Sequence, residues 1–145
     1  MRISSPAMPY FKDAEDVYAN LGRLFEDALA DEELGPRFRS TDTVVQYRMR
    51  RPDSQLTLRT LENDDLRVDF GVTELRPEVV LAMDADTAHR FWLGRVNVTV
   101  ALARGQISAR GPVAKILQLV PLVKPVRSRY ESQLEAAGRE DLAKA

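Results

Sequence analysis

The sequence predicts a single domain of the α+β class, in which helices pack on one face of a five-stranded, mainly antiparallel sheet. An amphipathic helix begins near Asp13, and three segments between residues 43 and 70 then alternate apolar with polar residues. The last third of the chain returns to helical spacing of its apolar residues. With 145 residues, the chain has the length of one domain and is long enough to bury a core.

The first helix is expected to start at Asp13, which suits the N-cap, with acidic residues in its first turn. From Val17 to Leu29, apolar residues recur at i, i+4, i+7, i+8, i+11 and i+12, so this helix presents a continuous apolar stripe. The preceding residues, 1–12, show no periodicity and are expected to form a loose arm. The domain is expected to span 13–137, followed by a polar tail, 138–145, that frays.

Three strands are expected at residues 43–50, 55–62 and 66–70. The turn sequences at 51–54 and 63–65 separate them, which favours an antiparallel meander. Alternation predicts one face that helices cover, made of Val45, Tyr47, Met49, Leu56, Leu58, Leu66, Val68 and Phe70. The opposite face is expected to meet water, with Gln46, Arg48, Arg50, Thr57, Arg59, Arg67 and Asp69. Two further strands are expected at 78–83 and 106–110.

The chain is organised around the stretch 84–111. Asp84 or Asp86 is expected to cap a helix that ends at Gly94, with Phe91 and Trp92 on its buried face. In the following segment, 95–104, the apolar residues alternate, which slightly favours a strand, although they also fit one face of a helix.

This stretch resembles the core signature of sterol carrier protein 2 domains. The resemblance is carried by the aromatic pair before Gly94-Arg95, by the apolar segment, and by Gly105-Gln-Ile-Ser-Ala-Arg-Gly111, and it extends over residues 17–134. It implies a fold for lipid binding and transfer, in which an apolar tunnel lies between the sheet and the helices. Because the segment 95–104 is helical in that family, we expect a helix there.

After Gly111, a helix is expected to begin at Pro112 and to be interrupted at Pro121, before a final helix at about 125–137. Proline inside a helical run removes a backbone hydrogen bond and kinks the axis. The segment 113–123 is therefore a short apolar element with a weakened connection, and we expect it to act as a lid.

The last third carries more large apolar side chains than two short helices need to cover one sheet. From the residues alone, these side chains form either an ordinary core or the wall of a cavity, and the resemblance favours the cavity. Because an empty cavity destabilises a protein, it should hold ligand, collapse partly or lie under a mobile lid. The expected lipid-binding residues are Tyr47, Met49, Leu58, Leu81, Met83, Phe91, Trp92, Val96, Val100, Ile116, Leu119, Val120 and Val123.

The arginines on the polar sheet face form a second candidate surface. They are Arg48, Arg50, Arg59 and Arg67. Two interpretations remain open, an ordinary solvated face and a weak docking surface for anionic lipid headgroups.

Composition disfavours several functional classes. The formal net charge of −1 argues against a nucleic-acid partner. Without cysteine, the chain has no disulfide, thiolate metal site or cysteine nucleophile. His89 is the single histidine, and we expect a structural or surface role because no nucleophile lies in a recognisable motif. Neither a metal nor a cofactor is expected, since no phosphate-binding loop is present.

We therefore expect a non-enzymatic, cytoplasmic protein that binds or transfers a sterol, fatty acid or fatty acyl-CoA. No signal peptide or membrane span is apparent in the sequence. One alternative is an accessory domain that binds a protein partner or presents a hydrophobic substrate to a separate enzyme. Another is a small cone-shaped enzyme of the steroid-isomerase type, which is disfavoured because the C-terminal half is mainly helical.

Overall fold

The computed structural model describes residues 9–144. Most of the arm expected at 1–12 lies outside the described residues, but its last residues are packed against the domain. Phe11 is buried in the core, and the backbone amide of Tyr10 donates a hydrogen bond to Asp86 Oδ1 at 3.0 Å. The ordered chain therefore begins before Asp13.

The helices are α1 (Ala14–Val17), α2 (Arg23–Ala30), α3 (Leu34–Arg39), α4 (Ala85–Trp92), α5 (Val98–Ala103), α6 (Val113–Leu119), α7 (Val123–Ala136) and α8 (Glu140–Ala143). The strands are β1 (Thr43–Arg50), β2 (Ser54–Thr60), β3 (Arg67–Phe70), β4 (Val79–Asp84) and β5 (Ile107–Arg110). A π-helical turn, Tyr18–Gly22, joins α1 to α2, and a 3-10 turn, Val120–Leu122, joins α6 to α7. Within residues 9–144, none of these helices is long and apolar enough to cross a membrane.

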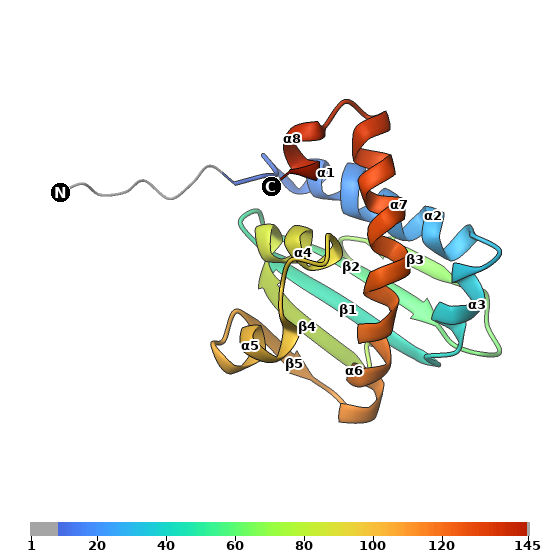
Figure 1. Ribbon diagram of the computed structural model, residues 1–145. Coiled ribbons are helices and arrows are strands. Elements are labelled where there is room, and N and C mark those ends of the chain that lie inside the picture. The colour runs from blue at the N-terminus through green and yellow to red at the C-terminus, as the bar shows by residue number, and fades with distance from the viewer. Residues whose placement is uncertain (1–8, 145) are drawn as a thin grey trace.

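The five strands form one sheet in the order β3-β2-β1-β4-β5 (Figure 1). Strands β1 and β4 pair in parallel, and the other neighbours pair antiparallel. The expected α+β class with a mainly antiparallel sheet is confirmed. The parallel pair arises because β3 and β4 both run in the direction of β1, so the connection 71–78 has to pass from one end of the sheet to the other.

Cross-strand pairing aligns the apolar residues on one face of the sheet. One row runs through Phe70, Leu56, Tyr47, Leu81 and Ala109, and the next contains Val68, Leu58, Val45 and Val79. Buried residues of α2, α4 and α7 belong to the same core, and Figure 1 shows these helices on one side of the sheet. The predicted helix-covered face is therefore confirmed.

The opposite face is polar, but it is less exposed than the sequence predicts. Gln46 and Thr57, expected to meet water, are buried, and Gln46 Nε2 donates to Thr57 Oγ1 at 3.0 Å. The connection 71–78 contacts this face, since the Thr73 hydroxyl donates to Asp69. Central positions of this face are thus screened from water by their polar neighbours.

The caps of the first and central helices show how tertiary contacts compete for carboxylates. Asp13 Oδ1 accepts a hydrogen bond from the Asp16 amide at 2.8 Å, as predicted for the first helix. The expected side-chain cap of α4 is wrong. Asp84 occupies the N-cap without a side-chain cap bond and instead pairs with Arg51 at 2.9 Å, while Asp86 accepts from Tyr10. At the other end, Gly94 has φ 74°, the left-handed conformation predicted to end this helix.

The segment 95–104 contains helix α5, as the resemblance implies, and the strand that periodicity slightly favours is wrong. Asn97 caps this helix, because its Oδ1 accepts a hydrogen bond from the Val100 amide at 3.1 Å. Ala101 is its buried residue, whereas Val100 stays exposed. The alternation of valines misleads because these side chains border the core instead of lining a sheet.

The path from α6 to α7 remains helical through Pro121. The bounding residues of the 3-10 turn, Leu119 and Val123, both have right-handed helical dihedral angles. Pro121 lies in the first positions of that turn, where its missing amide removes one hydrogen bond to the preceding turn of α6. Pro112 is the N-cap of α6 and precedes the first helical residue. The expected interruption at Pro121 is therefore a tightening of the helix, without a break.

The C-terminal tail, expected to fray, folds back on the domain. Residues Glu140–Ala143 form α8, and Leu142 is buried in the core. Arg139 Nη1 donates to Asp16 Oδ1 at 3.3 Å and so ties the tail to the first helix. The polar composition of the tail predicts fraying, but burial of Leu142 and the ion pair between Arg139 and Asp16 hold it in place.

Candidate functional site

An aromatic cluster fills the centre of the helix-covered face. The ring centroids of Phe25 and Tyr47 are 5.4 Å apart, and Trp92 lies 5.1 Å from Phe25 and 5.0 Å from Phe91. Tyr47 and Trp92, both predicted to bind lipid, are buried here. Burial raises the pKa of Tyr47 well above its ordinary value. These two rings pack against other core side chains and lie away from the cavity described next.

An apolar cavity lies beside this cluster, between the end of the sheet and the helices α4, α5 and α6. Its walls are Leu81, Met83, Phe91, Val98, Leu102, Ile107, Ala109, Ile116, Leu119 and Val120. Strands β4 and β5 supply the floor, because Leu81 pairs with Ala109 and Met83 with Ile107 on the helix-covered face. Helices α5 and α6, which precede and follow β5 in the chain, supply further walls. The cavity is thus lined by aliphatic side chains, one thioether and one phenyl ring.

The cavity brings together part of the predicted lipid-binding set. Leu81, Met83, Phe91, Ile116, Leu119 and Val120 line it. The other predicted residues lie elsewhere: Tyr47, Met49, Leu58 and Trp92 in the core, Val96 and Val123 partly buried against the core, and Val100 on the surface. Their assignment as a lipid-binding wall stays a prediction.

Sequence reasoning missed four wall residues, Val98, Leu102, Ile107 and Ala109. The signal for the last two was visible, because they stand at i and i+2 in a strand bracketed by glycines. Val98 and Leu102 stand four residues apart in a segment whose secondary structure was ambiguous. Their common helical face could be recognised only once that segment was known to be a helix.

The cavity is almost closed in this conformation. It encloses about 20 Å³ of free space, which is on the order of a single water molecule. An acyl chain or a sterol ring is many times larger. Any such ligand therefore requires α5 or α6 to move away from the sheet.

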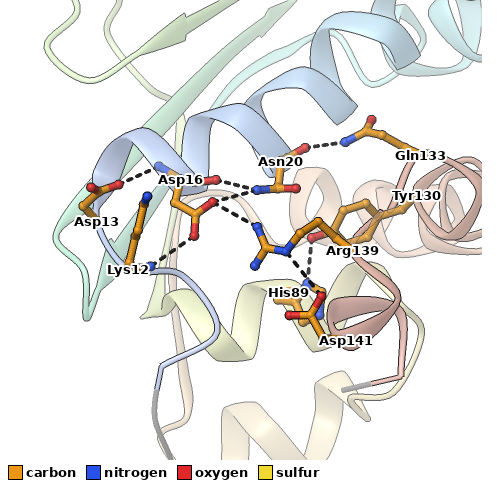
Figure 2. A network of polar contacts seen from close by, with 9 residues as sticks. All are labelled: Lys12, Asp13, Asp16, Asn20, His89, Tyr130, Gln133, Arg139 and Asp141. Atoms are coloured by element: carbon orange, nitrogen blue, oxygen red, sulfur yellow. Dashed lines mark hydrogen bonds and ion pairs between the residues drawn. The ribbon is translucent and has the colours of Figure 1, made fainter. Parts of the chain in front are cut away.

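A polar network holds the opposite end of the molecule together (Figure 2). His89 Nε2 donates to the Leu142 carbonyl oxygen at 2.8 Å, and its Nδ1 accepts from the Tyr130 hydroxyl at 2.6 Å. Both ring nitrogens are therefore occupied by bonds to α7 and α8. Burial lowers the pKa of His89 to about 4, so the neutral imidazole is present near neutral pH. This geometry agrees with the structural role expected for His89. Within residues 9–144, no three acidic or histidine side chains are placed to bind a metal ion.

A wide polar groove of about 1000 Å³ runs between α2, α3 and α7. Its wall contains the ion pair between Arg129 and Asp31. The backbone amides of Leu34 and Glu33 donate to Asp31 and lower the pKa of its carboxyl group. These charged groups already bind one another, so the groove is unsuited to an apolar ligand.

The four arginines of the polar sheet face do lie on one side of the sheet. Arg59 pairs across the strands with Arg67, which binds Asp69 at 2.7 Å and lowers the pKa of that carboxyl group. Arg50 lies 3.5 Å from Asp84, whereas Arg48 Nε donates to Gln46 Oε1. Carboxylates thus offset part of the positive charge. Docking of this face on anionic headgroups stays a prediction.

Comparison with known proteins places the fold. No family model matches the chain. Hydroxysteroid dehydrogenase-like protein 2 of Mus musculus is 26% identical over 124 residues, which are 86% of this chain and 24% of that protein. The chain thus spans about a quarter of the curated relative.

Two solved structures are similar to the whole domain. The sterol carrier protein domain 2 of Helicoverpa armigera has a TM-score of 0.64 at 14% identity, covering 88% of this chain and 96% of that one. Sterol Carrier Protein-2 of Aedes aegypti, in complex with palmitate, has a TM-score of 0.50 at 16% identity, covering 76% of this chain and 93% of that one. The chain therefore has the fold of sterol carrier protein 2 domains, which confirms the resemblance noted in its sequence.

Proposed function

We propose that this protein binds an apolar lipid, such as a sterol, a fatty acid or a fatty acyl-CoA, between the sheet and helices α4, α5 and α6. The observation that carries the proposal is the cavity itself, whose walls are apolar throughout. The driving force is transfer of apolar ligand surface out of water, which needs no acid, base or nucleophile. The palmitate complex of the Aedes aegypti protein, which has the same fold, supports this choice of ligand.

Binding requires a lid, and the segment 113–123 is the element we assign to that role. Ile116 and Leu119 close the cavity, while Val113 and Leu117 on the same short helix point to solvent. Leu119 is the buried residue of α6, and Lys115 Nζ donates to the Thr41 and Asp42 carbonyl oxygens from the partly exposed side. Elements with so little buried surface open at low local free energy. Opening of this element would enlarge the cavity enough to admit a lipid.

The ligand range is expected to be broad. Aliphatic walls discriminate a single methylene by only about 1 to 3 kcal/mol. We therefore expect micromolar affinity for several fatty acids, acyl-CoAs and sterols. The walls hold no convergent polar cluster that would select one headgroup.

Native mass spectrometry of the purified protein tests the proposal directly. We expect a co-purified lipid, or saturable uptake of palmitate when it is added. A binding panel of fatty acids, acyl-CoAs and sterols then measures the range. Nanomolar affinity for a single ligand would contradict broad specificity, and the absence of any binding would contradict the function itself.

The curated relative favours a second candidate function. Only 24% of hydroxysteroid dehydrogenase-like protein 2 matches this chain, so the shared fold is one part of a longer protein named after an enzyme. On this view, the domain presents an apolar substrate to a separate enzyme. The same mass spectrometry would then report a bound protein in addition to lipid.

A further inference from the structure

The end of the molecule formed by α5 and α6 exposes an unusual amount of apolar surface. Among the described residues, five of the seven exposed large apolar side chains lie there: Val113 (69% exposed), Leu117 (63%), Val100 (41%), Leu102 (38%) and Val120 (38%). Figure 1 shows α5 and α6 at the end remote from α8. We call these five residues the α5–α6 patch.

The patch adjoins the part of the apolar cavity nearest to solvent, which we call its mouth. Leu102 and Val120 belong to both, because each lines the cavity and is also exposed to solvent. Val113, Leu117 and Val120 follow at i, i+4 and i+7 and form one stripe along the helical path. A surface that covers this patch would therefore face the cavity directly.

The segment that carries the patch contains only basic charged residues, although Lys115 on α6 lies 3.9 Å from Asp42 Oδ2. Residues 87–130 contain eight basic and no acidic residues, although the whole chain has a formal net charge of −1. The remaining residues together therefore carry −9. Lys124 extends the stripe at i+4 from Val120, and Arg104 follows directly after α5. Within residues 9–144, neither side chain has an ion-pair partner, and both are exposed.

We propose that the α5–α6 patch docks on an anionic lipid bilayer, so that the cavity mouth opens into lipid instead of water. Apolar side chains flanked by cations are the combination that holds a protein at a lipid interface. The acidic remainder of the molecule would be repelled by the same surface, which fixes the orientation. Displacement of α6 by lipid would also open the cavity. This docking proposal depends on the proposed function only in its choice of ligand, a lipid that enters the cavity from the bilayer.

The polar sheet face is the competing docking surface, and the structure favours it less. Arg50 and Arg67 bind Asp84 and Asp69 on that face, and its central residues include no exposed large apolar side chain. Docking there would depend on partly neutralised charges alone. The α5–α6 patch combines exposed apolar side chains with cations that have no ion-pair partner.

Co-sedimentation with vesicles tests the apolar part of the proposal. We would compare phosphatidylcholine vesicles with vesicles that also contain phosphatidylglycerol. Leu117→Ser should weaken binding to the anionic vesicles roughly tenfold, because a leucine side chain no longer leaves water. Val72→Ser is the matched control: Val72 is 96% exposed, lies between β3 and β4, and should leave binding unchanged. Neither residue lines the cavity.

Matched double variants that neutralise two cations test the electrostatic part of the proposal. Arg104→Gln with Lys124→Gln should weaken binding about fivefold for each cation removed and reduce its salt dependence. Lys12→Gln with Lys144→Gln changes the net charge equally but at the end near α8, and should have little effect.

Several results would overturn the proposal. These are equal binding to neutral and anionic vesicles, unchanged binding of Leu117→Ser, and release of the protein by Arg48→Ser with Arg50→Ser. Self-association that Leu117→Ser abolishes would show instead that a second copy covers the patch. Palmitate binding without vesicles is measured on the same variants. Its absence would refute the proposed function, while the vesicle data still decide the docking surface.

Discussion

The two ends of the helix-covered sheet face are closed in different ways. Near α7 and α8, the rings of Tyr10, Phe11 and Tyr130 lie 5.1 to 5.5 Å from the ring of His89, which uses both nitrogens in hydrogen bonds. Near α5 and α6, aliphatic side chains enclose a small cavity and several remain exposed. The first end is held by directional contacts among rings and polar groups. The second is held by contacts that water, lipid or another side chain could replace.

Helix packing adds to this difference. Helices α5 (six residues) and α6 (seven) each bury one residue, whereas α7 (14 residues) buries Val126, Tyr130 and Leu134. Short helices gain little stability from their own hydrogen bonds and depend on packing. The α5–α6 end therefore depends on the very contacts that ligand would displace, while the α7–α8 end does not. We therefore call the α7–α8 end the fixed end and expect the α5–α6 end to open more readily.

The largest expected effect is in the central aromatic cluster, outside the cavity wall. Trp92→Ala removes a fully buried indole and should lower the free energy of unfolding by about 3 to 5 kcal/mol. Ile116→Val, at the cavity, should cost about 0.5 to 1.5 kcal/mol. Urea unfolding followed by far-UV circular dichroism measures both, because Trp92 is the only tryptophan available for fluorescence. Equal losses at the two sites would remove the distinction between the central cluster and the cavity wall.

The pH dependence of stability should trace to the fixed end. Burial lowers the pKa of His89 in the folded protein to about 4, against an ordinary value of 6.5, so between these values the unfolded chain binds the extra proton. Stability is then complete above about pH 6.5 and falls by about 3 kcal/mol as the pH is lowered toward 4. His89→Gln should be less stable at pH 7 but should lose this slope. An unchanged slope in the variant would assign the pH dependence to other groups.

Filling the cavity should separate binding from stability. Ala109→Leu adds side-chain volume to the cavity floor and should abolish palmitate binding, while overpacking costs about 1 to 3 kcal/mol. Ala82→Leu is the control, because Ala82 lies in β4 on the opposite face of the sheet, where it pairs with Ser108. Titration with palmitate and urea unfolding measure the two effects. Undiminished binding in Ala109→Leu would place the ligand elsewhere.

The smallest effect is local and concerns the lid. Palmitate should slow amide hydrogen exchange most at 113–123 and at 91–100, because these segments border the cavity and are held by few contacts. Exchange in β1 and β2 should change little. The Ala109→Leu variant supplies the unliganded control. Uniform protection, or protection confined to the strands, would mean that 113–123 is ordinary core and that ligand enters by another route.

Local patterns were sufficient for the features that depend on neighbouring residues. Alternation placed Val45, Tyr47 and Leu58 on the face that helices cover, because successive side chains of a strand point to opposite sides. Asp13 and Gly94 marked helix ends, since a cap bond and a left-handed residue act within one turn. These effects span only a few residues, so the sequence carries them directly.

Contacts between distant segments decided the rest. Asp84 was a reasonable helix cap until Arg51, 33 residues away, supplied a competing partner. Tyr47 and Leu81 are cross-strand neighbours on one face, yet only Leu81 lies beside α5 and α6 and lines the cavity. The two-residue alternation of a strand predicts which face of the sheet a side chain occupies. It does not predict which helix lies over that side chain.

The sequence by itself therefore determined the α+β class, the strand faces and the apolar character of the last third, because each follows from local spacing and composition. Periodicity left 95–104 open and the family resemblance indicated the helix found at 98–103, whereas tertiary structure alone decided that β4 joins β1 in parallel and that α8 folds back on His89. It also decided which apolar residues enclose the cavity. The reason is physical: burial and pairing depend on segments that meet in space after long chain separations, and no local window contains both partners.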